Sequence, residues 1–185
     1  MTLGDPFQDV LVIQDRLPIL HSTVEALPPS EELARVNEAN EGLLRVYVSL
    51  DDASPRVNEE LGSEISHELA RIETKLNVIL EMLGSLLHTQ VKSPDPVTMR
   101  ISAEGLGWVQ AERLEPGQML RMHWHLCPQF PRPLELYGEV ASCQAVADGF
   151  DISVGFRGLS PLLEDGIQKL VFRRHRRSVA QSRAR

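Results

Sequence analysis

The sequence has few cysteines, no long apolar run and no positive charge near its start. Two cysteines, Cys127 and Cys143, among 185 residues exclude a disulfide framework and a zinc ribbon. No apolar run reaches the roughly 18 residues that a transmembrane helix needs, so we expect no membrane association. Residues 1–15 contain three aspartates and no Lys or Arg. We therefore expect no signal peptide, and a cytoplasmic location with reduced thiols.

The charged residues are unevenly distributed along the chain. All 26 acidic residues lie in residues 1–172 with 13 of the 19 Lys and Arg, which gives this part a net charge of −13. Residues 173–185 contain six arginines and no acid, a charge of +6. An acidic body argues against a protein that coats nucleic acid. The basic end leaves one local anionic contact open, and nucleic acid there would be bound weakly and in a salt-sensitive manner.

The residues before 50 predict one strand and one helix. Residues 7–21 resemble a strand that is interrupted by Pro18, which is typical of an edge strand or a bulge. Ser30 is expected to cap a helix over 30–49. Asn40 stands at a position of this helix where another apolar residue would fit its stripe.

The clearest periodic pattern lies in residues 56–90, which predict a second helix. Its apolar residues recur at alternating spacings of four and three, and they are Ile65, Leu69, Ile72, Leu76, Ile79, Leu83 and Leu86. We call these seven residues the seam. Leu at heptad position a with Ile at d shifts the preference of a coiled coil from dimers to trimers or tetramers. Leu80, Met82 and Leu87 widen the stripe, as a four-stranded bundle requires.

Two arrangements of this helix remain open. We expect a homo-oligomer, with a tetramer favoured, because the apolar surface exceeds what one short partner helix would cover. The alternative is an intramolecular hairpin, in which the seam packs on helix 30–49 or on the sheet. The direction of the helices in a bundle is not specified by the pattern.

From Val97 onward the apolar period is two, which indicates strands. Short antiparallel strands are expected to begin at 97 and 106 and to cover 119–126, 134–146 and 150–156. A last helix begins at Ser160-Pro161 and should dock Leu163, Ile167, Leu170 and Val171 on the strands.

These elements predict an α+β fold. It is a small antiparallel β-barrel with an inserted helical hairpin, which carries the heptad coiled coil, and with a C-terminal helix. The expected divisions are a first barrel strand region in 1–27, an oligomerisation hairpin in 28–92, the barrel with its C-terminal helix in 93–181, and a tail in 182–185.

No pattern typical of an enzyme is present. His123 and His125 form a possible zinc pair without a third ligand, and we interpret them as part of a polar, solvent-facing strand face. Cys127 near His125 lacks an Asn or Asp partner that the sequence identifies. Glu139 and Asp151 are not placed in a cleft by any motif. With no P-loop and no GxGxxG, we expect neither an enzyme nor a metal site.

Several short motifs in residues 97–177 together resemble a PilZ domain. Residues 101–106, ISAEGL, resemble the D/N-x-S-x-x-G turn of that family. Residues 138–140, GEV, resemble its G-x-V strand, and residues 154–159, VGFRGL, resemble its closing strand. The resemblance implies a β-barrel module of bacterial cyclic-di-GMP signalling, of the non-canonical type that carries inserted helices and forms oligomers.

The resemblance also implies where a ligand would bind. PilZ domains hold cyclic-di-GMP with an RxxxR pair before the first strand and with the D/N-x-S-x-x-G turn, because guanidinium forks suit phosphates and guanine edges. This sequence has no early RxxxR, and Arg100 stands at the Asp/Asn position. Ser102 and Gly105 remain, and Gly105 is interpreted as a turn residue with positive φ. Arg173 and Arg177 have RxxxR spacing, but in the last helix.

Two functions follow from these departures. The first is an adaptor without a cofactor, which self-associates and acts through a protein partner in signalling or motility, with the usual cyclic-di-GMP contacts missing. The second is a genuine cyclic-di-GMP receptor that uses Arg100, Ser102, Gly105, Arg173 and Arg177.

Overall fold

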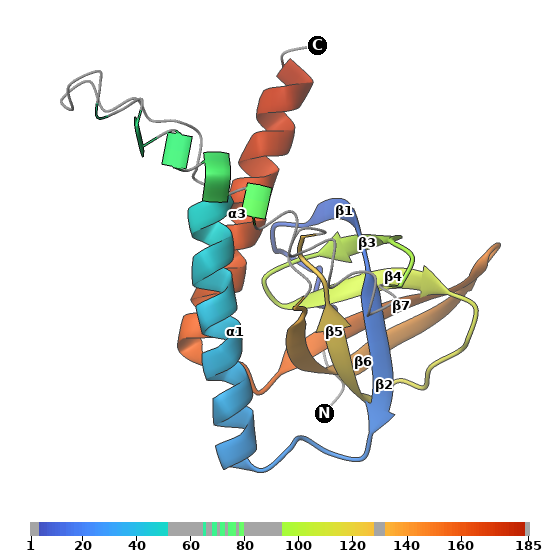
Figure 1. Ribbon diagram of the computed structural model, residues 1–185. Coiled ribbons are helices and arrows are strands. Elements are labelled where there is room, and N and C mark those ends of the chain that lie inside the picture. Colours follow the sequence, from blue (N-terminus) through green and yellow to red (C-terminus); the bar gives the residue numbers. More distant parts are fainter. Residues whose placement is uncertain are drawn as a thin grey trace.

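The computed structural model describes residues 4–51, 94–127 and 132–183, and also 65, 68, 69, 71, 72, 74–76, 78 and 79. Two long helices stand side by side against a curled sheet (Figure 1). In chain order the elements are β1 (Ile13–Leu17), β2 (Ile19–Val24), α1 (Ser30–Asp51), β3 (Val97–Ile101), β4 (Gly105–Gln110), β5 (Met119–Trp124), β6 (Leu134–Val146), β7 (Gly149–Arg157) and α3 (Pro161–Arg183). Among the described residues, no helix combines the length and the apolar character needed to cross a membrane.

The seven strands form one antiparallel sheet in the order β1-β3-β4-β7-β6-β5-β2. The outermost strands, β1 and β2, are successive parts of one segment, so Pro18 between them joins the two edges of the sheet and closes the barrel. Proline suits this position because it has no N–H to donate to a ladder. Its carbonyl still accepts a hydrogen bond from the backbone N–H of His125, at 3.0 Å. The predicted interruption at Pro18 is therefore the point where the strand changes partner.

The core fills the barrel and the interface with α3. Side chains that alternate along β5 and β6 are fully buried, among them Leu120, Met122, Trp124 and Leu134. The four residues predicted to dock the last helix are also buried, and they are Leu163, Ile167, Leu170 and Val171. Ser160 caps this helix, because its Oγ accepts a hydrogen bond from the N–H of Leu163 at 3.1 Å.

Two buried asparagines hold α1 on the barrel. Asn37 Nδ2 donates to the carbonyl of Gly158 at 2.9 Å. Asn40 Nδ2 donates to the carbonyl of Glu135 at 2.6 Å, and its Oδ1 accepts from the N–H of Glu135 at 3.1 Å. Asn40 thus stands in the apolar stripe because its side chain bonds to both the N–H and the carbonyl of Glu135 on β6.

Two sequence-based expectations differ in detail from the structure. Ser30 is the first residue of α1 rather than its cap, since the N–H of Leu33 bonds to the carbonyl of Pro29 at 2.9 Å. His125 does not share a solvent-facing strand with His123, because it follows the end of β5 and its side chain is buried. The helix predicted over 56–90 is described only in part, and its described residues between 65 and 79 are helical.

Candidate functional site

The described part of the seam is largely accessible to solvent. Ile65, Leu69, Ile72, Leu76 and Ile79 each expose between 51% and 55% of their surface. Leu83 and Leu86 lie outside the described residues. The other described residues of this helix are exposed too, Val78 among them at 47%, so the rest of the described chain leaves the helix and its seam uncovered.

The side chain of Arg100, on β3, contacts other side chains at the surface of the barrel. Its Nη2 donates to both carboxylate oxygens of Asp151 on β7, at 2.8 and 2.9 Å, and to Ser153 Oγ at 3.3 Å. The centre of its guanidinium lies 4.6 Å from the centroid of the Phe7 ring. One edge of the guanidinium therefore faces a carboxylate, and one face is covered by an aromatic ring.

Ser102 and Gly105 form the turn between β3 and β4. Ser102 Oγ is buried, accepts from the N–H groups of Glu104 (3.1 Å) and Gly105 (3.0 Å), and donates to the carbonyl of Pro6 at 2.8 Å. The expectation of a positive φ at Gly105 is wrong. Among the described glycines, positive φ angles occur at Gly117, Gly149 and Gly158. Glycine is needed at 105 because a Cβ there would lie 2.2 Å from the carbonyl oxygen of Val154.

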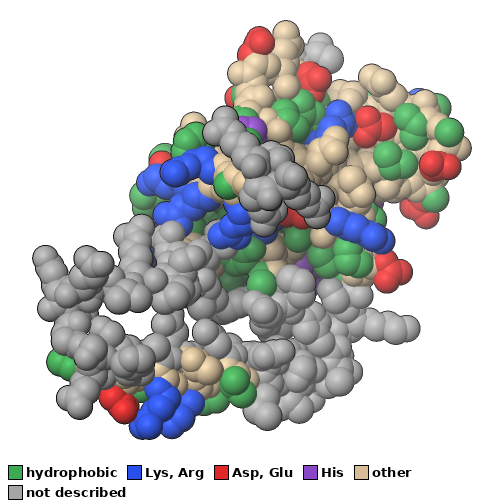
Figure 2. Space-filling model, turned by 90° about the horizontal axis from the view of Figure 1, so that it is seen from above, with side chains coloured by type: hydrophobic (Ala, Val, Ile, Leu, Met, Phe, Trp, Pro, Cys, Tyr) green, Lys and Arg blue, Asp and Glu red, His purple; other side chains and the backbone are tan. Residues whose placement is uncertain are grey.

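Arg173 and Arg177, the two arginines of α3 with RxxxR spacing, line different hollows. Arg173 lines a hollow of about 620 Å³ between α1 and α3, with Leu44 and Leu162. Arg177 lines another of about 520 Å³, with Arg174 and Asp15. Figure 2 shows Lys and Arg side chains gathered on the face viewed along the C-terminal part of α3. The structure thus brings Ser102 and Gly105 together, whereas Arg100, Arg173 and Arg177 occupy three separate places.

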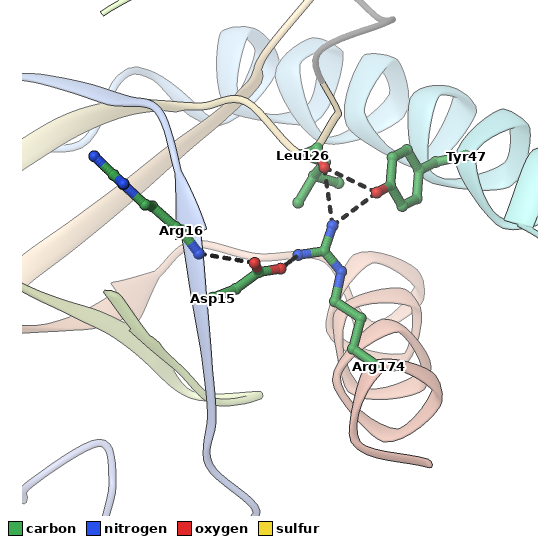
Figure 3. A network of polar contacts seen from close by, with 5 residues as sticks. All are labelled: Asp15, Arg16, Tyr47, Leu126 and Arg174. Atoms are coloured by element: carbon green, nitrogen blue, oxygen red, sulfur yellow. Dashed lines mark hydrogen bonds and ion pairs between the residues drawn. The ribbon is translucent and has the colours of Figure 1, made fainter. Parts of the chain in front are cut away.

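A polar network that the sequence analysis missed lies beside Arg177. Arg174 donates to the Asp15 carboxylate of β1, to Tyr47 Oη at 2.7 Å and to the carbonyl of Leu126 at 2.9 Å (Figure 3). Tyr47 Oη also donates to the Leu126 carbonyl, at 2.8 Å. We call these four residues the clamp, because they join β1, α1, α3 and the segment after β5. The contact between Arg174 and Asp15 links residues 159 positions apart, so no local pattern could have identified the clamp.

A second charged cluster lies on the outer face of β5 and β6. Arg121 Nε lies 2.8 Å from Glu135 Oε1, and Tyr137 Oη donates to the same oxygen at 3.0 Å. Burial raises the pKa of Glu135, but the hydrogen bonds from Arg121 and Tyr137 outweigh it, so the net pKa lies below 4.5. Burial and the bond to Glu135 raise the pKa of Tyr137 above 10.0. His123 lies 3.8 Å from this carboxylate, and the described residues contain no group of three ligands that could hold a metal ion.

Comparisons with known proteins agree with this architecture. Residues 44–184 match the family model described as atypical PilZ domain, cyclic di-GMP receptor. A solved structure from Xanthomonas campestris, described as a tetrameric PilZ domain self-assembled through an unusual helical bundle, is 22% identical, with a TM-score of 0.76. The alignment covers 94% of this chain and 93% of that one.

A second solved structure, the inhibitor of motility of Bacillus subtilis, is 19% identical with a TM-score of 0.38. It covers 43% of this chain and 41% of that one. The search of curated proteins gives no match. Because the family model spans most of the chain and the Xanthomonas structure shares its fold, the chain belongs to the atypical PilZ domain family.

Proposed function

We propose that this protein is a self-associating PilZ module, which assembles through its seam and acts in cyclic-di-GMP signalling by contacts with other proteins. The observation that carries the proposal is the exposure of five seam residues, each at 51–55%. Fully burying a Leu or Ile stabilises by about 1.5–3 kcal/mol, so covering the exposed half of each contributes roughly 1 kcal/mol. Five such residues contribute roughly 5 kcal/mol per chain in favour of association.

The order of the assembly is proposed from the chemistry of the seam. Leu69 and Leu76 stand at heptad position a, with Ile72 and Ile79 at d, and this arrangement packs better in four-stranded than in two-stranded coils. The similar Xanthomonas protein is described as a tetramer that forms through a helical bundle. We therefore propose a tetramer for this chain as well.

An adaptor role is supported by how the ligand-type residues are engaged. The charge of Arg100 is paired with Asp151, and the Ser102 hydroxyl is used within its own turn and by Pro6. A phosphate would have to compete with a carboxylate at 2.8 Å for the Arg100 guanidinium. Contacts with a protein partner do not require this competition.

The experiment that tests assembly is sedimentation equilibrium on the full chain at micromolar concentration. We expect a tetramer for the native protein and smaller species for Ile72→Asp, because a carboxylate in a coiled-coil core is buried without a partner. Thr74→Asp is the matched control, since it adds the same charge to the same helix but lies outside the seam. Fluorescence of the buried Trp108 and Trp124 verifies that the barrel stays folded. A monomeric native protein, or an Ile72→Asp variant that stays tetrameric, would overturn the proposal.

A second candidate function, a cyclic-di-GMP receptor, is favoured by one observation. The hollow of about 520 Å³ beside the clamp is lined by Arg174, His175 and Arg177, and Asp15, which also lines it, is paired with Arg174. For a receptor of this kind, calorimetric titration of cyclic-di-GMP should give heat that is reduced in Arg177→Ala and retained in Arg173→Ala, because Arg173 lines the other hollow. Unaltered affinity in Arg177→Ala would remove Arg177 from the site.

A further inference from the structure

The hairpin of β6 and β7 extends beyond the other strands of the sheet (Figure 1). β6 pairs with β5 only as far as Glu139, whereas its pairing with β7 continues to the end of the strand. The last bonds on its β5 side belong to Val140, whose N–H donates to the Gln118 carbonyl at 2.9 Å and whose carbonyl accepts from the N–H of Gly117 at 2.8 Å. Beyond Val140, this side of β6 has no strand partner among the described residues. We call residues 142–146 on this side the open edge.

The backbone groups of Cys143 and Ala145 point to the open edge. A bulge between Val140 and Ser142 gives β6 one more residue than β7 at this point. Val140 directs its N–H and carbonyl away from β7 and its side chain into the core. After the bulge, Cys143 again packs its side chain against the core, so its N–H and carbonyl, and those of Ala145 two residues later, also point away from β7. Both residues therefore offer a donor and an acceptor that no described backbone group uses.

The open edge lacks the features by which proteins usually block a free strand. Such edges are commonly protected by lysine, by proline, or by a helix or loop that covers them. Residues 142–146, SCQAV, contain no charge and no proline. Gln144, Ala145 and Val146 are exposed. A strand of this length extends over roughly 17 Å, which is enough to pair with a short extended segment.

The charge near the open edge favours a basic segment. Asp148 lies in the exposed turn that follows β6, and it forms no ion pair with another described residue. Residues 1–172 as a whole carry a net charge of −13. A second copy of the chain would bring the same carboxylate and the same acidic body to the edge, whereas Lys or Arg in a partner strand complements them.

We propose that the open edge is the surface on which this protein receives a partner protein, and that the partner adds an extended segment containing Lys or Arg as a further strand beside β6. In strand addition of this kind, backbone hydrogen bonds supply the affinity and the side chains supply the specificity. This inference rests on the adaptor role proposed above, to which it gives a docking surface. It does not depend on self-association, because no seam residue lies in β6.

The test uses a dye-labelled synthetic peptide, KTVTVTK, whose alternating β-branched residues favour an extended strand and whose ends are basic. Fluorescence anisotropy with the full chain should show saturable binding. The peptide KTPTPTK, in which two prolines remove backbone donors, should bind at least about tenfold more weakly. The peptide ETVTVTE keeps the strand but reverses the charge of its ends, so it should also bind more weakly.

Variants of the open edge locate the binding. Ala145→Pro removes one outward N–H at a kind of strand position where proline is tolerated, and it should weaken KTVTVTK binding at least about tenfold. Ala145→Ser is the matched control, since it keeps the N–H and should leave the affinity unchanged. Asp148→Lys lies in the exposed turn and serves if the proline variant does not fold. At low salt it should weaken KTVTVTK and strengthen ETVTVTE, each at least about threefold.

The inference is overturned if KTVTVTK does not bind the native protein at millimolar concentration, or if KTPTPTK binds as tightly. Equal affinity of the folded Ala145→Pro and Ala145→Ser variants would also overturn it. Ala145→Pro should sediment as the native protein does, and a smaller species would show instead that a second copy occupies the edge. Ile72→Asp should bind KTVTVTK with native affinity, so a failure of self-association is distinguishable from a failure of this inference.

Discussion

Replacing Arg174 by alanine should destabilise the protein by about 2 kcal/mol, a value that follows from the clamp. The Arg174 side chain is 14% exposed, and its bonds to Tyr47 Oη and to the Leu126 carbonyl each contribute about 1 kcal/mol. The ion pair with Asp15 contributes only about 0.5 kcal/mol, because the Asp15 side chain is 39% exposed and water screens it. The Leu126 carbonyl keeps Tyr47 as its donor, which limits the loss.

Thermal unfolding followed by tryptophan fluorescence measures this effect. For a chain of this length, about 2 kcal/mol corresponds to a fall in Tm of about 4–8 °C, provided that the protein concentration is the same for all variants. Arg176→Ala is the matched control, because Arg176 is an exposed arginine of the same helix and its removal should change Tm by less than about 2 °C. Equal shifts for the two variants would show that the clamp contributes nothing beyond a general effect of charge, and the reasoning would be refuted.

Two further predictions concern α1 and β6. Asn40→Ala should lower the free energy of unfolding by about 2–4 kcal/mol in urea titrations, because it removes the side-chain partners of both backbone groups of Glu135, whereas the exposed Glu38→Ala should change it little. An Asn40→Ala loss below about 0.5 kcal/mol would contradict the contact. The lowered pKa of Glu135 should add stability that is fully present above pH 4.5 and is lost as the pH falls through the folded-state pKa, so the Tm difference between the native protein and Glu135→Gln should shrink on acidification, and a pH-independent difference would argue against this origin.

Most of the barrel could be predicted from the sequence because its strands follow a local rule. The alternation along 119–126 placed Leu120, Met122 and Trp124 on one face, and these residues are buried in the core. Ser160 was expected to precede the last helix, and it caps that helix. Each of these signals depends on residues within a few positions of one another, so a single sequence is sufficient to identify them.

The contacts between elements could not be predicted because they join distant residues. Asn40 and Glu135 are 95 positions apart, and Asn40 alone looked like a defect in an apolar stripe. The sequence predicts a positive φ at Gly105, whereas the structure requires glycine there because a carbonyl of β7 leaves no room for a Cβ. In both cases the residue type correctly marks an unusual position, but the physical reason is a backbone group of a strand that is distant in the sequence.

The contacts that attach α1 to the barrel do not involve the seam. Tyr47 lies near the end of α1, from which the chain continues towards the seam, and the clamp fixes that end of the helix to β1 and α3. Asn37 and Asn40 fix the preceding turns of α1 to the barrel. The C-terminal end of α1 is therefore held on the barrel by bonds that do not involve seam residues. For the proposed tetramer, loss of the clamp should then leave self-association intact, whereas Ile72→Asp should abolish it and leave Tyr47 and Arg174 in contact.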